Sequence, residues 1–217
     1  MPVKFKLIRD KVIQTGIKMS GGGLVLGTWG NISARIPEEN YVAITPSGVD
    51  YDNIGLEDIV IVDLDGNIID GSKKPSIELI LHLEVYKSRE NVNAIVHTHS
   101  EYCTALAIAR KGIPAAAEDL VQIAGGDIRV TKYCLPGSKE LGIETVKALK
   151  DRNAVILANH GCLAAAKDLK EALKVALIAE KSAKATIFAQ LMGGVVELSQ
   201  HDIDFMRDFY LNKYGQR

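Results

Sequence analysis

Hydrophobic residues recur along the chain with two different spacings, and together these spacings predict both helices and short strands. In residues 5–19 the apolar positions return every three or four residues, which is the period of a helix with one buried stripe. Residues 168–192 repeat this pattern behind Asp168, a residue type that often caps helices. The short apolar runs at residues 41–44 and 92–98 are instead typical of buried strands.

The same reasoning extends to the rest of the chain. Further helices are predicted over residues 77–88, 101–110, 115–122, 139–150 and 199–214, and further strands over residues 58–63, 68–69, 128–130, 155–158 and 161–165. No linker, repeat or low-complexity segment divides these elements. We therefore expect one α/β domain over residues 1–217, with a mixed, largely antiparallel sheet and helices on its faces.

Three of the five histidines follow predicted strands. His97 and His99 end the strand predicted at residues 92–98, and His160 follows the apolar run 154–158. Side chains two residues apart on a strand point to the same face, so His97 and His99 can aim at one point. Neutral imidazole is a common metal ligand, and a zinc site needs three or four such groups. These histidines are candidate ligands; the alternative is that they simply end strands at the surface.

A carboxylate and a fourth histidine lie on one predicted helix. Glu78 falls in the first turn of the helix over residues 77–88, where the helix dipole favours a negative charge. A functional interpretation makes it a metal ligand or an acid/base group. His82 follows four residues later on the same helical face. Because leucines surround it in the sequence, we interpret His82 as a packed core histidine rather than as a ligand.

Two polar turns are candidates for binding an anion. Residues 27–35 form a glycine-rich stretch, expected to be a loop, and residues 45–48 form a turn with two hydroxyl groups. Glycine allows close approach of the backbone, so such turns can cradle an anion with their N–H groups. Neither stretch has the spacing of a P-loop or of a dinucleotide fingerprint. Ordinary turns at the ends of strands are the alternative.

Composition and charge exclude several classes of protein. A net charge of −1 gives no basic footprint for nucleic acid, and no apolar run approaches the ~18 residues of a membrane span. The start of the chain does not have the pattern of a signal peptide. The three cysteines, in irregular spacing, are typical of reduced thiols. We expect a cytoplasmic globular protein that binds neither nucleic acid nor membranes.

Five short motifs follow one another along the chain: Gly27-Thr-Trp-Gly-Asn31-Ile-Ser33, Ile44-Thr-Pro-Ser47-Gly48, Pro75-Ser76-Ile-Glu78, His97-Thr-His99 and Asn159-His160-Gly161. Together they resemble the motifs of the class II aldolase/adducin family, and most of all those of its L-fuculose-1-phosphate aldolase branch. The resemblance covers about residues 5–190. Their order and approximate spacing, taken together, are specific for the family and less specific for the reaction.

The resemblance implies a metal-dependent enzyme with a three-layer α/β fold that assembles as a cyclic homotetramer, with active sites between subunits. Zinc, or alternatively Mn²⁺, Co²⁺ or Fe²⁺, would be bound by His97, His99 and His160, with Glu78 as fourth ligand or as catalytic base. The phosphate group of a sugar phosphate would lie against the residues of the polar turns. These are Gly30, Asn31, Ser47, Gly48, Ser76 and Ile77.

Two departures from the family pattern concern the phosphate and the second acid/base group. Ile77 stands where fuculose aldolase has a second serine, so one hydroxyl contact is missing. Glu118, followed by Asp119, stands where the aldolase uses a catalytic tyrosine of the adjacent subunit. A carboxylate has an unperturbed pKa of roughly 4 rather than 10. Tyr210 or Tyr214, near the end of the chain, could supply the missing phenol.

The resemblance leaves several activities open. The first is cleavage of a (deoxy)ketose 1-phosphate, such as L-fuculose 1-phosphate or 5-deoxyribulose 1-phosphate, to dihydroxyacetone phosphate and an aldehyde. The second is another reaction on the same zinc site, either that of a methylthioribulose-1-phosphate dehydratase with Glu118 as base or that of a pentulose-phosphate 4-epimerase. The third is a non-catalytic, adducin-like scaffold. The retained histidines and Glu78 argue against a scaffold, since adducin-type domains lose metal ligands.

Overall fold

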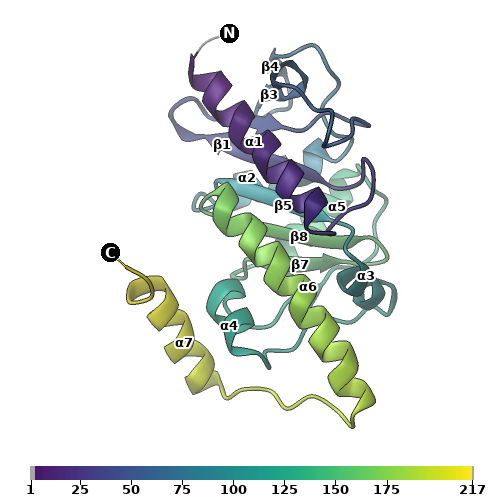
Figure 1. The fold of residues 1–217 in the computed structure, drawn as a ribbon, viewed down its shortest axis with the longest axis vertical. Helices are drawn as coiled ribbons and strands as arrows, with labels where there is room; N and C mark the ends of the chain where they lie inside the picture. Colours follow the sequence, from purple (N-terminus) through teal and green to yellow (C-terminus); the bar gives the residue numbers. More distant parts are fainter. Residues whose placement is uncertain (1–2, 217) are drawn as a thin grey trace.

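The computed structural model describes residues 3–216, and within them the strands join into one eight-stranded sheet (Figure 1). The strands are β1 (Asn31–Ile36), β2 (Tyr41–Ile44), β3 (Val60–Asp63), β4 (Ile68–Asp70), β5 (Ala94–Thr98), β6 (Arg129–Val130), β7 (Ala154–Leu157) and β8 (Gly161–Ala166). Their order across the sheet is β4-β3-β2-β1-β5-β8-β7-β6. Neighbouring strands are antiparallel except β6 and β7, which confirms the mixed, mostly antiparallel sheet.

Helices cover both faces of this sheet. They are α1 (Val3–Gly21), α2 (Leu79–Ser88), α3 (Glu101–Ile108), α4 (Glu118–Ala124), α5 (Lys139–Leu149), α6 (Leu169–Leu191) and α7 (Gln200–Asn212). In Figure 1, α1 and α6 cross the sheet on the same face, whereas α7 lies to one side next to α4. Helices α2 and α5 pack together on the opposite face. The predicted α/β fold class is therefore confirmed.

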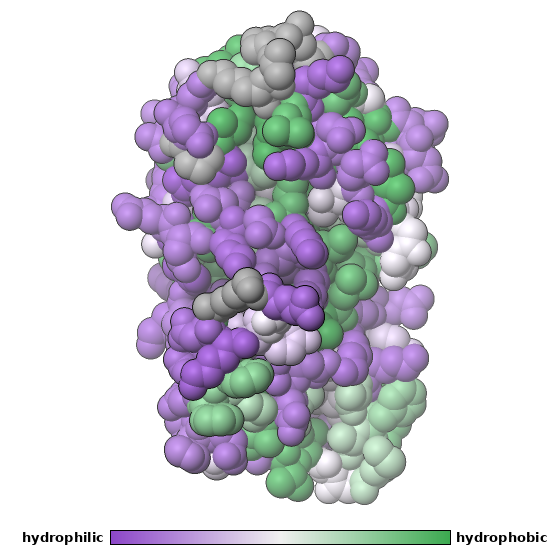
Figure 2. Space-filling model, turned by 60° about the vertical axis from the view of Figure 1, so that its left-hand side comes forward, coloured by the Kyte–Doolittle hydropathy of each residue, from purple (hydrophilic) through white to green (hydrophobic). Residues whose placement is uncertain are grey.

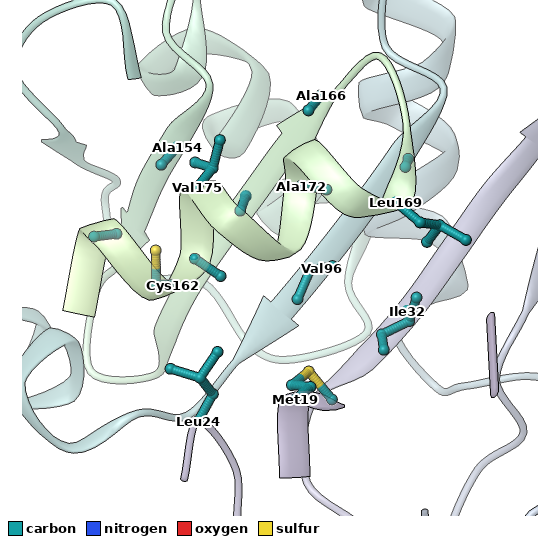
Figure 3. Packing of buried hydrophobic residues seen from close by; sticks show 14 of the residues in the cluster. Met19, Leu24, Ile32, Val96, Ala154, Cys162, Ala166, Leu169, Ala172 and Val175 are labelled. Carbon is teal, nitrogen blue, oxygen red and sulfur yellow. The ribbon is translucent and has the colours of Figure 1, made fainter. Parts of the chain in front are cut away.

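Alternation along the strands builds two hydrophobic cores, one on each face. In β5, Val96 belongs to the core beneath α1 and α6, whereas Ile95 belongs to the core beneath α2 and α5. Figure 3 shows the first core, where Ile32 and Val96 of the sheet lie beneath Ala172 and Val175 of α6. Burying one such side chain contributes roughly 1.5–3 kcal/mol, so this packing holds the ends of the strands in fixed positions.

Several helix limits agree with the sequence signals. The side chain of Asp168 accepts a hydrogen bond from the backbone N–H of Glu171 at the start of α6, as its predicted capping role requires. Ser199 caps α7 in the same way by accepting from the N–H of Asp202. Because each cap satisfies a helical N–H that lacks a partner within its helix, these residues fix where the helices begin.

Several predicted boundaries were wrong. Residues 31–35, expected as part of a loop, form β1 in the middle of the sheet, because Ile32 and Ala34 alternate with polar residues at strand spacing. The strand expected at residues 58–63 begins at Val60, after the short 3₁₀ helix Leu56–Asp58. Helix α2 begins two residues later than predicted, and α4 is shifted by three residues at its start.

One face of the molecule is largely polar. Figure 2 shows one face on which hydrophilic side chains predominate and hydrophobic side chains form smaller patches. Within residues 3–216, no helix has both the length and the apolar character that crossing a bilayer requires. Cys103, Cys134 and Cys162 are all free thiols, as the sequence predicted.

Candidate active site

The sheet brings the predicted metal ligands to one of its edges. His97 is the penultimate residue of β5, and His99 follows the end of that strand. Strand β8 pairs with β5, with Cys162 opposite Thr98, so the turn that carries His160 lies beside the end of β5. Glu78 is the N-cap of α2 rather than a residue of its first turn. The ligand atoms of these four side chains all lie within 4.8 Å of one another.

The distances in this Glu78–His97–His99–His160 cluster fit one metal ion. Nε2 of His97 lies 3.0 Å from Nε2 of His99 and 3.2 Å from Oε2 of Glu78. Nε2 of His160 lies 3.4 Å from Oε1 of Glu78. With metal–ligand bonds of about 2.0–2.2 Å, ligand atoms of a tetrahedral zinc site are about 3.3–3.6 Å apart. The buried Oε1 of Glu78 also has no hydrogen-bond partner among the described residues, as expected for an atom that binds a cation.

Neighbouring groups contact three of these candidate ligands. Nδ1 of His97 lies 3.0 Å from the carbonyl oxygen of Cys162 and donates to it, so its Nε2 keeps a free lone pair for a metal. Oε2 of Glu78 accepts a hydrogen bond of 2.9 Å from Nδ2 of Asn31. The ring of Trp29 lies against the ring of His99, with 5.4 Å between centroids. The ligands are thus held in place by groups of the same chain.

Burial and neighbouring charges shift the pKa values of the four candidate ligands. Burial, together with the neighbouring His97, lowers the pKa of His99 to about 3 and that of His160 to about 4, so both imidazoles are neutral at neutral pH. Burial opposes ionisation of Glu78, but His97, His160 and the Asn31 hydrogen bond outweigh it and hold its pKa well below the usual range. Burial likewise opposes protonation of His97, but Glu78 outweighs it and raises the pKa of that imidazole.

A cavity of about 460 Å³ opens beside the cluster, and both polar turns line it. Backbone hydrogen bonds tie the turn at residues 45–48 to the segment before α2, because the N–H of Ser76 donates to Thr45 and the N–H of Ser47 donates to Lys74. All six predicted phosphate-binding residues line the cavity, and the side chain of one of them, Ile77, is 70% exposed. A hydroxyl-rich surface and a candidate metal site therefore face the same space.

Two glycines allow the backbone to approach the cluster closely. Gly30 has a φ of +73°, and a Cβ atom there would lie 2.5 Å from the carbonyl oxygen of His97. A Cβ atom at Gly161 would lie 2.2 Å from the carbonyl oxygen of Thr98. Real Cβ atoms do not approach oxygen so closely, so any larger residue would push the strand ends apart. The glycines of the predicted motifs therefore have a packing role at this site.

The structure of one chain does not bring the predicted second acid/base groups to the cluster. Glu118 is exposed at the start of α4, and Asp119 pairs with Lys181 of α6. The hydroxyl of Tyr210 makes hydrogen bonds with Lys174 and Glu171 on the same helix, α6. None of the residues Glu118, Asp119, Tyr210 and Tyr214 lines the cavity.

Sequence reasoning gave no functional role to three residues at this site. Trp29 and Tyr133 line the cavity and are 64% and 49% exposed, so they offer aromatic surface to a bound molecule. His82 is fully buried, as predicted for a core histidine, but both of its ring nitrogens are hydrogen-bonded to polar groups near Glu78. The spacing of four residues between Glu78 and His82 was the feature of the sequence that could have indicated a role for His82 near the carboxylate.

Comparisons with known proteins agree with this site. The family described as Class II Aldolase and Adducin N-terminal domain matches residues 10–187. A 5-deoxy-D-ribulose 1-phosphate aldolase from Bacillus thuringiensis serovar kurstaki is 44% identical over 168 residues, which are 77% of this chain and 78% of that protein. A solved L-fuculose 1-phosphate aldolase has a TM-score of 0.92 at 37% identity, over 94% of this chain and 96% of that chain. The L-fuculose-1-phosphate aldolase structure from Thermus thermophilus has a TM-score of 0.75 at 26% identity, over 88% of this chain and 98% of that chain.

The family match includes every residue of the metal cluster and of the two polar turns. The matched region of the family begins within α1 and ends within α6, so it includes the whole sheet. Class II aldolases depend on a metal ion, and the cluster of one carboxylate and three imidazoles supplies a site for it. By its sequence and its fold, the chain belongs to the class II aldolase and adducin family.

Proposed function

We propose that this protein is a metal-dependent lyase that cleaves a (deoxy)ketose 1-phosphate to dihydroxyacetone phosphate and an aldehyde. One observation carries the proposal: a four-residue metal cluster and two hydroxyl-bearing turns face the same cavity. The names of two relatives support it, since one is a 5-deoxy-D-ribulose 1-phosphate aldolase and the other an L-fuculose 1-phosphate aldolase. Both of these sugar phosphates are candidate substrates.

The cluster fits zinc, which accepts imidazole and carboxylate ligands, although the same atoms also accept Mn²⁺, Co²⁺ or Fe²⁺. A divalent cation bound there would supply Lewis-acid stabilisation of the negative charge that develops when the carbon–carbon bond breaks. The three imidazoles hold no charge of their own in this role. Their orientation on paired strand ends keeps their lone pairs directed at one point.

Glu78 is the proposed proton carrier as well as a proposed ligand. Its low pKa keeps it ionised at neutral pH, which a base requires. Asn31 holds Oε2, whereas Oε1 has no hydrogen-bond partner among the described residues. In the condensation direction, Glu78 would take a proton from the hydroxymethyl carbon of dihydroxyacetone phosphate, which is the carbon that does not bear the phosphate and that bonds to the aldehyde. In cleavage it would return a proton to the same carbon.

The two polar turns are the proposed phosphate site. Hydroxyl groups and backbone N–H groups bind phosphate oxygens well, and glycine lets the backbone come close to them. The exposed Ile77 replaces one hydroxyl contact with an apolar surface. The residues assigned to this role are Gly30, Asn31, Ser47, Gly48, Ser76 and Ile77.

We further propose a homotetramer in which a neighbouring subunit completes the site. Within one chain, the Glu118 carboxylate and the Tyr210 hydroxyl lie outside the cavity beside the cluster. A second copy of the chain would have to supply one of them as the second acid/base group. Glu118 is the first candidate, because it stands where the family pattern has a catalytic tyrosine.

An assay with a panel of substrates tests this function. Zinc-loaded protein is given L-fuculose 1-phosphate, 5-deoxyribulose 1-phosphate, methylthioribulose 1-phosphate and ribulose 5-phosphate in turn, and dihydroxyacetone phosphate is detected through NADH oxidation. We expect a chelator-sensitive signal with a deoxyketose 1-phosphate. Loss of water from methylthioribulose 1-phosphate without any triose phosphate would replace the aldolase with a dehydratase, and epimerisation of ribulose 5-phosphate would replace it with an epimerase.

A further inference from the structure

A chain of buried hydrogen bonds runs from Glu78 into the core between the sheet and α2. Nδ2 of Asn31 lies 2.9 Å from Oε2 of Glu78, and Oδ1 of Asn31 lies 2.5 Å from Nε2 of His82. Oγ of Ser33 lies 2.6 Å from Nδ1 of His82 and 2.8 Å from the hydroxyl of Tyr86. All five side chains belong to β1 or to α2 and its N-cap.

The acceptor at one end fixes the direction of every bond in this chain. An ionised carboxylate only accepts, so the NH₂ group of Asn31 must face Glu78 and its carbonyl oxygen must face His82. That carbonyl oxygen also only accepts, so Nε2 of His82 must carry the proton. Nδ1 of His82 then accepts from the hydroxyl of Ser33, which in turn accepts from the hydroxyl of Tyr86. All donors therefore point towards Glu78.

We propose that His82 is a positioning residue for Glu78, which acts by fixing the orientation of the Asn31 side-chain amide. An amide can present either its NH₂ group or its oxygen to a neighbour, and only the first attracts a carboxylate. The donor of His82 selects that orientation. The expected effect of His82 on turnover rests on the proposed function. Its expected effect on metal binding is independent of that function.

The surroundings of His82 favour this role over simple packing. His82 is 0% exposed and Asn31 is 4% exposed, so bulk water is not available to replace the donor. His82 follows Glu78 by one helical turn, so the backbone of α2 fixes its ring relative to the carboxylate. Burial, together with the neighbouring His97, lowers the pKa of His82 to about 3, which keeps the ring in its neutral form.

A double-mutant cycle separates positioning from packing. The variants are His82→Leu, Asn31→Ala and the double variant, and the measurement is zinc affinity by competition with a chelator. Loss of a group that orients a ligand typically weakens metal binding by about 10–100-fold. We expect His82→Leu to weaken binding to this extent in the natural protein and by less than about threefold in the Asn31→Ala background, because coupled residues are not additive.

Two further variants serve as controls. His82→Gln keeps an N–H donor and should restore most of the affinity that His82→Leu loses. Leu81→Ala removes a neighbouring, fully buried side chain of α2, so it should lower thermal stability while leaving zinc affinity unchanged. If the losses of zinc affinity in His82→Leu and Asn31→Ala simply add in the double variant, and His82→Gln restores none of the affinity, His82 has only a packing role in the core.

The tautomer of His82 gives a test that needs no variant, even if His82→Leu does not fold. In ¹⁵N NMR spectra of the metal-loaded protein, we expect a protonated Nε2 and an unprotonated Nδ1 for His82. A protonated Nδ1 would overturn the inference. If zinc affinity behaves as expected but no sugar phosphate is cleaved, the proposed function fails and the positioning role stands.

Discussion

The metal cluster and the surface formed by α4 and α7 hold acid–base side chains in opposite surroundings. In the cluster, Glu78 and His97 are buried, and Nε2 of His97 lies 3.2 Å from Oε2 of Glu78. On the α4–α7 surface, Glu118 is exposed, and the hydroxyl of Tyr210 is hydrogen-bonded to Lys174 and Glu171. One chain is enough to assemble the first group, whereas the second group remains apart from the cavity.

The difference shows that a side chain at the end of a paired strand and a side chain on the outer surface of a helix have different kinds of neighbours. Backbone hydrogen bonds bring the ends of paired strands to one edge of the sheet, so side chains at these ends converge within a single chain. A side chain on the outer surface of a helix has no such constraint. In the homotetramer that we propose, a second copy of the chain brings Glu118 or Tyr210 to the cavity.

The largest effect should come from removing one ligand of the cluster. We expect His97→Ala to lose bound zinc and to lower the rate of cleavage by more than about a hundredfold, which is the upper range for groups that merely orient a ligand. Metal analysis of the purified variant and an assay of turnover check this. His201→Ala, a change of an exposed histidine on α7, is the control. A His97→Ala variant that keeps one zinc ion per chain is incompatible with our set of ligands.

Glu78→Gln tests the proton carrier of the same region. Glutamine keeps the shape of the side chain but cannot take a proton, so kcat should fall by about 10²–10⁴-fold. The fall in kcat should exceed any fall in zinc content, which mass spectrometry under native conditions measures on the same sample. Unchanged kcat in a fully metal-loaded Glu78→Gln variant is the result that excludes Glu78 as the base.

Glu118→Gln tests the contrast between the two regions. If a neighbouring subunit brings Glu118 to the cavity, kcat should fall by about 10²-fold while zinc content stays unchanged. Asp119→Asn is the matched control, because it alters the adjacent carboxylate, which pairs with Lys181. Full turnover in the Glu118→Gln variant rejects this residue, and the same experiment with Tyr210→Phe then tests the phenol.

Ser47→Ala should have the smallest effect. Loss of one hydrogen bond to a charged phosphate costs about 1.5–3 kcal/mol, which corresponds to roughly a 10–150-fold rise in KM. Zinc content should not change, because Ser47 is outside the metal cluster. Steady-state kinetics provide the measurement, with Ser199→Ala at the start of α7 as control. A variant with natural KM shows that the phosphate lies elsewhere.

Much of the fold follows from local sequence patterns. The apolar period of residues 5–19 and the capping Asp168 identified α1 and α6, and the apolar run before His97 identified β5. Local patterns were less informative where tertiary contacts determine the secondary structure. The glycines before Asn31 suggested a loop, but pairing on both sides makes residues 31–36 a central strand.

The site could be predicted only in part for the same reason. Its metal ligands stand in recognisable motifs at strand ends, and the structure brings them together. The hydrogen bonds of His82 join α2 to β1, and no spacing along the chain reveals a contact between residues 51 positions apart, such as His82 and Asn31. Contacts between separate copies of the chain are even further from the reach of local patterns.

Titration of metal-free protein with zinc tests the central claim most directly. The rate at which dihydroxyacetone phosphate forms from a deoxyketose 1-phosphate is measured as zinc is added to protein stripped with a chelator. We predict that the rate rises linearly and stops rising at one zinc ion per chain, while His97→Ala protein stays inactive throughout. Full activity of the stripped protein would contradict a metal-dependent aldolase built on the Glu78–His97–His99–His160 cluster.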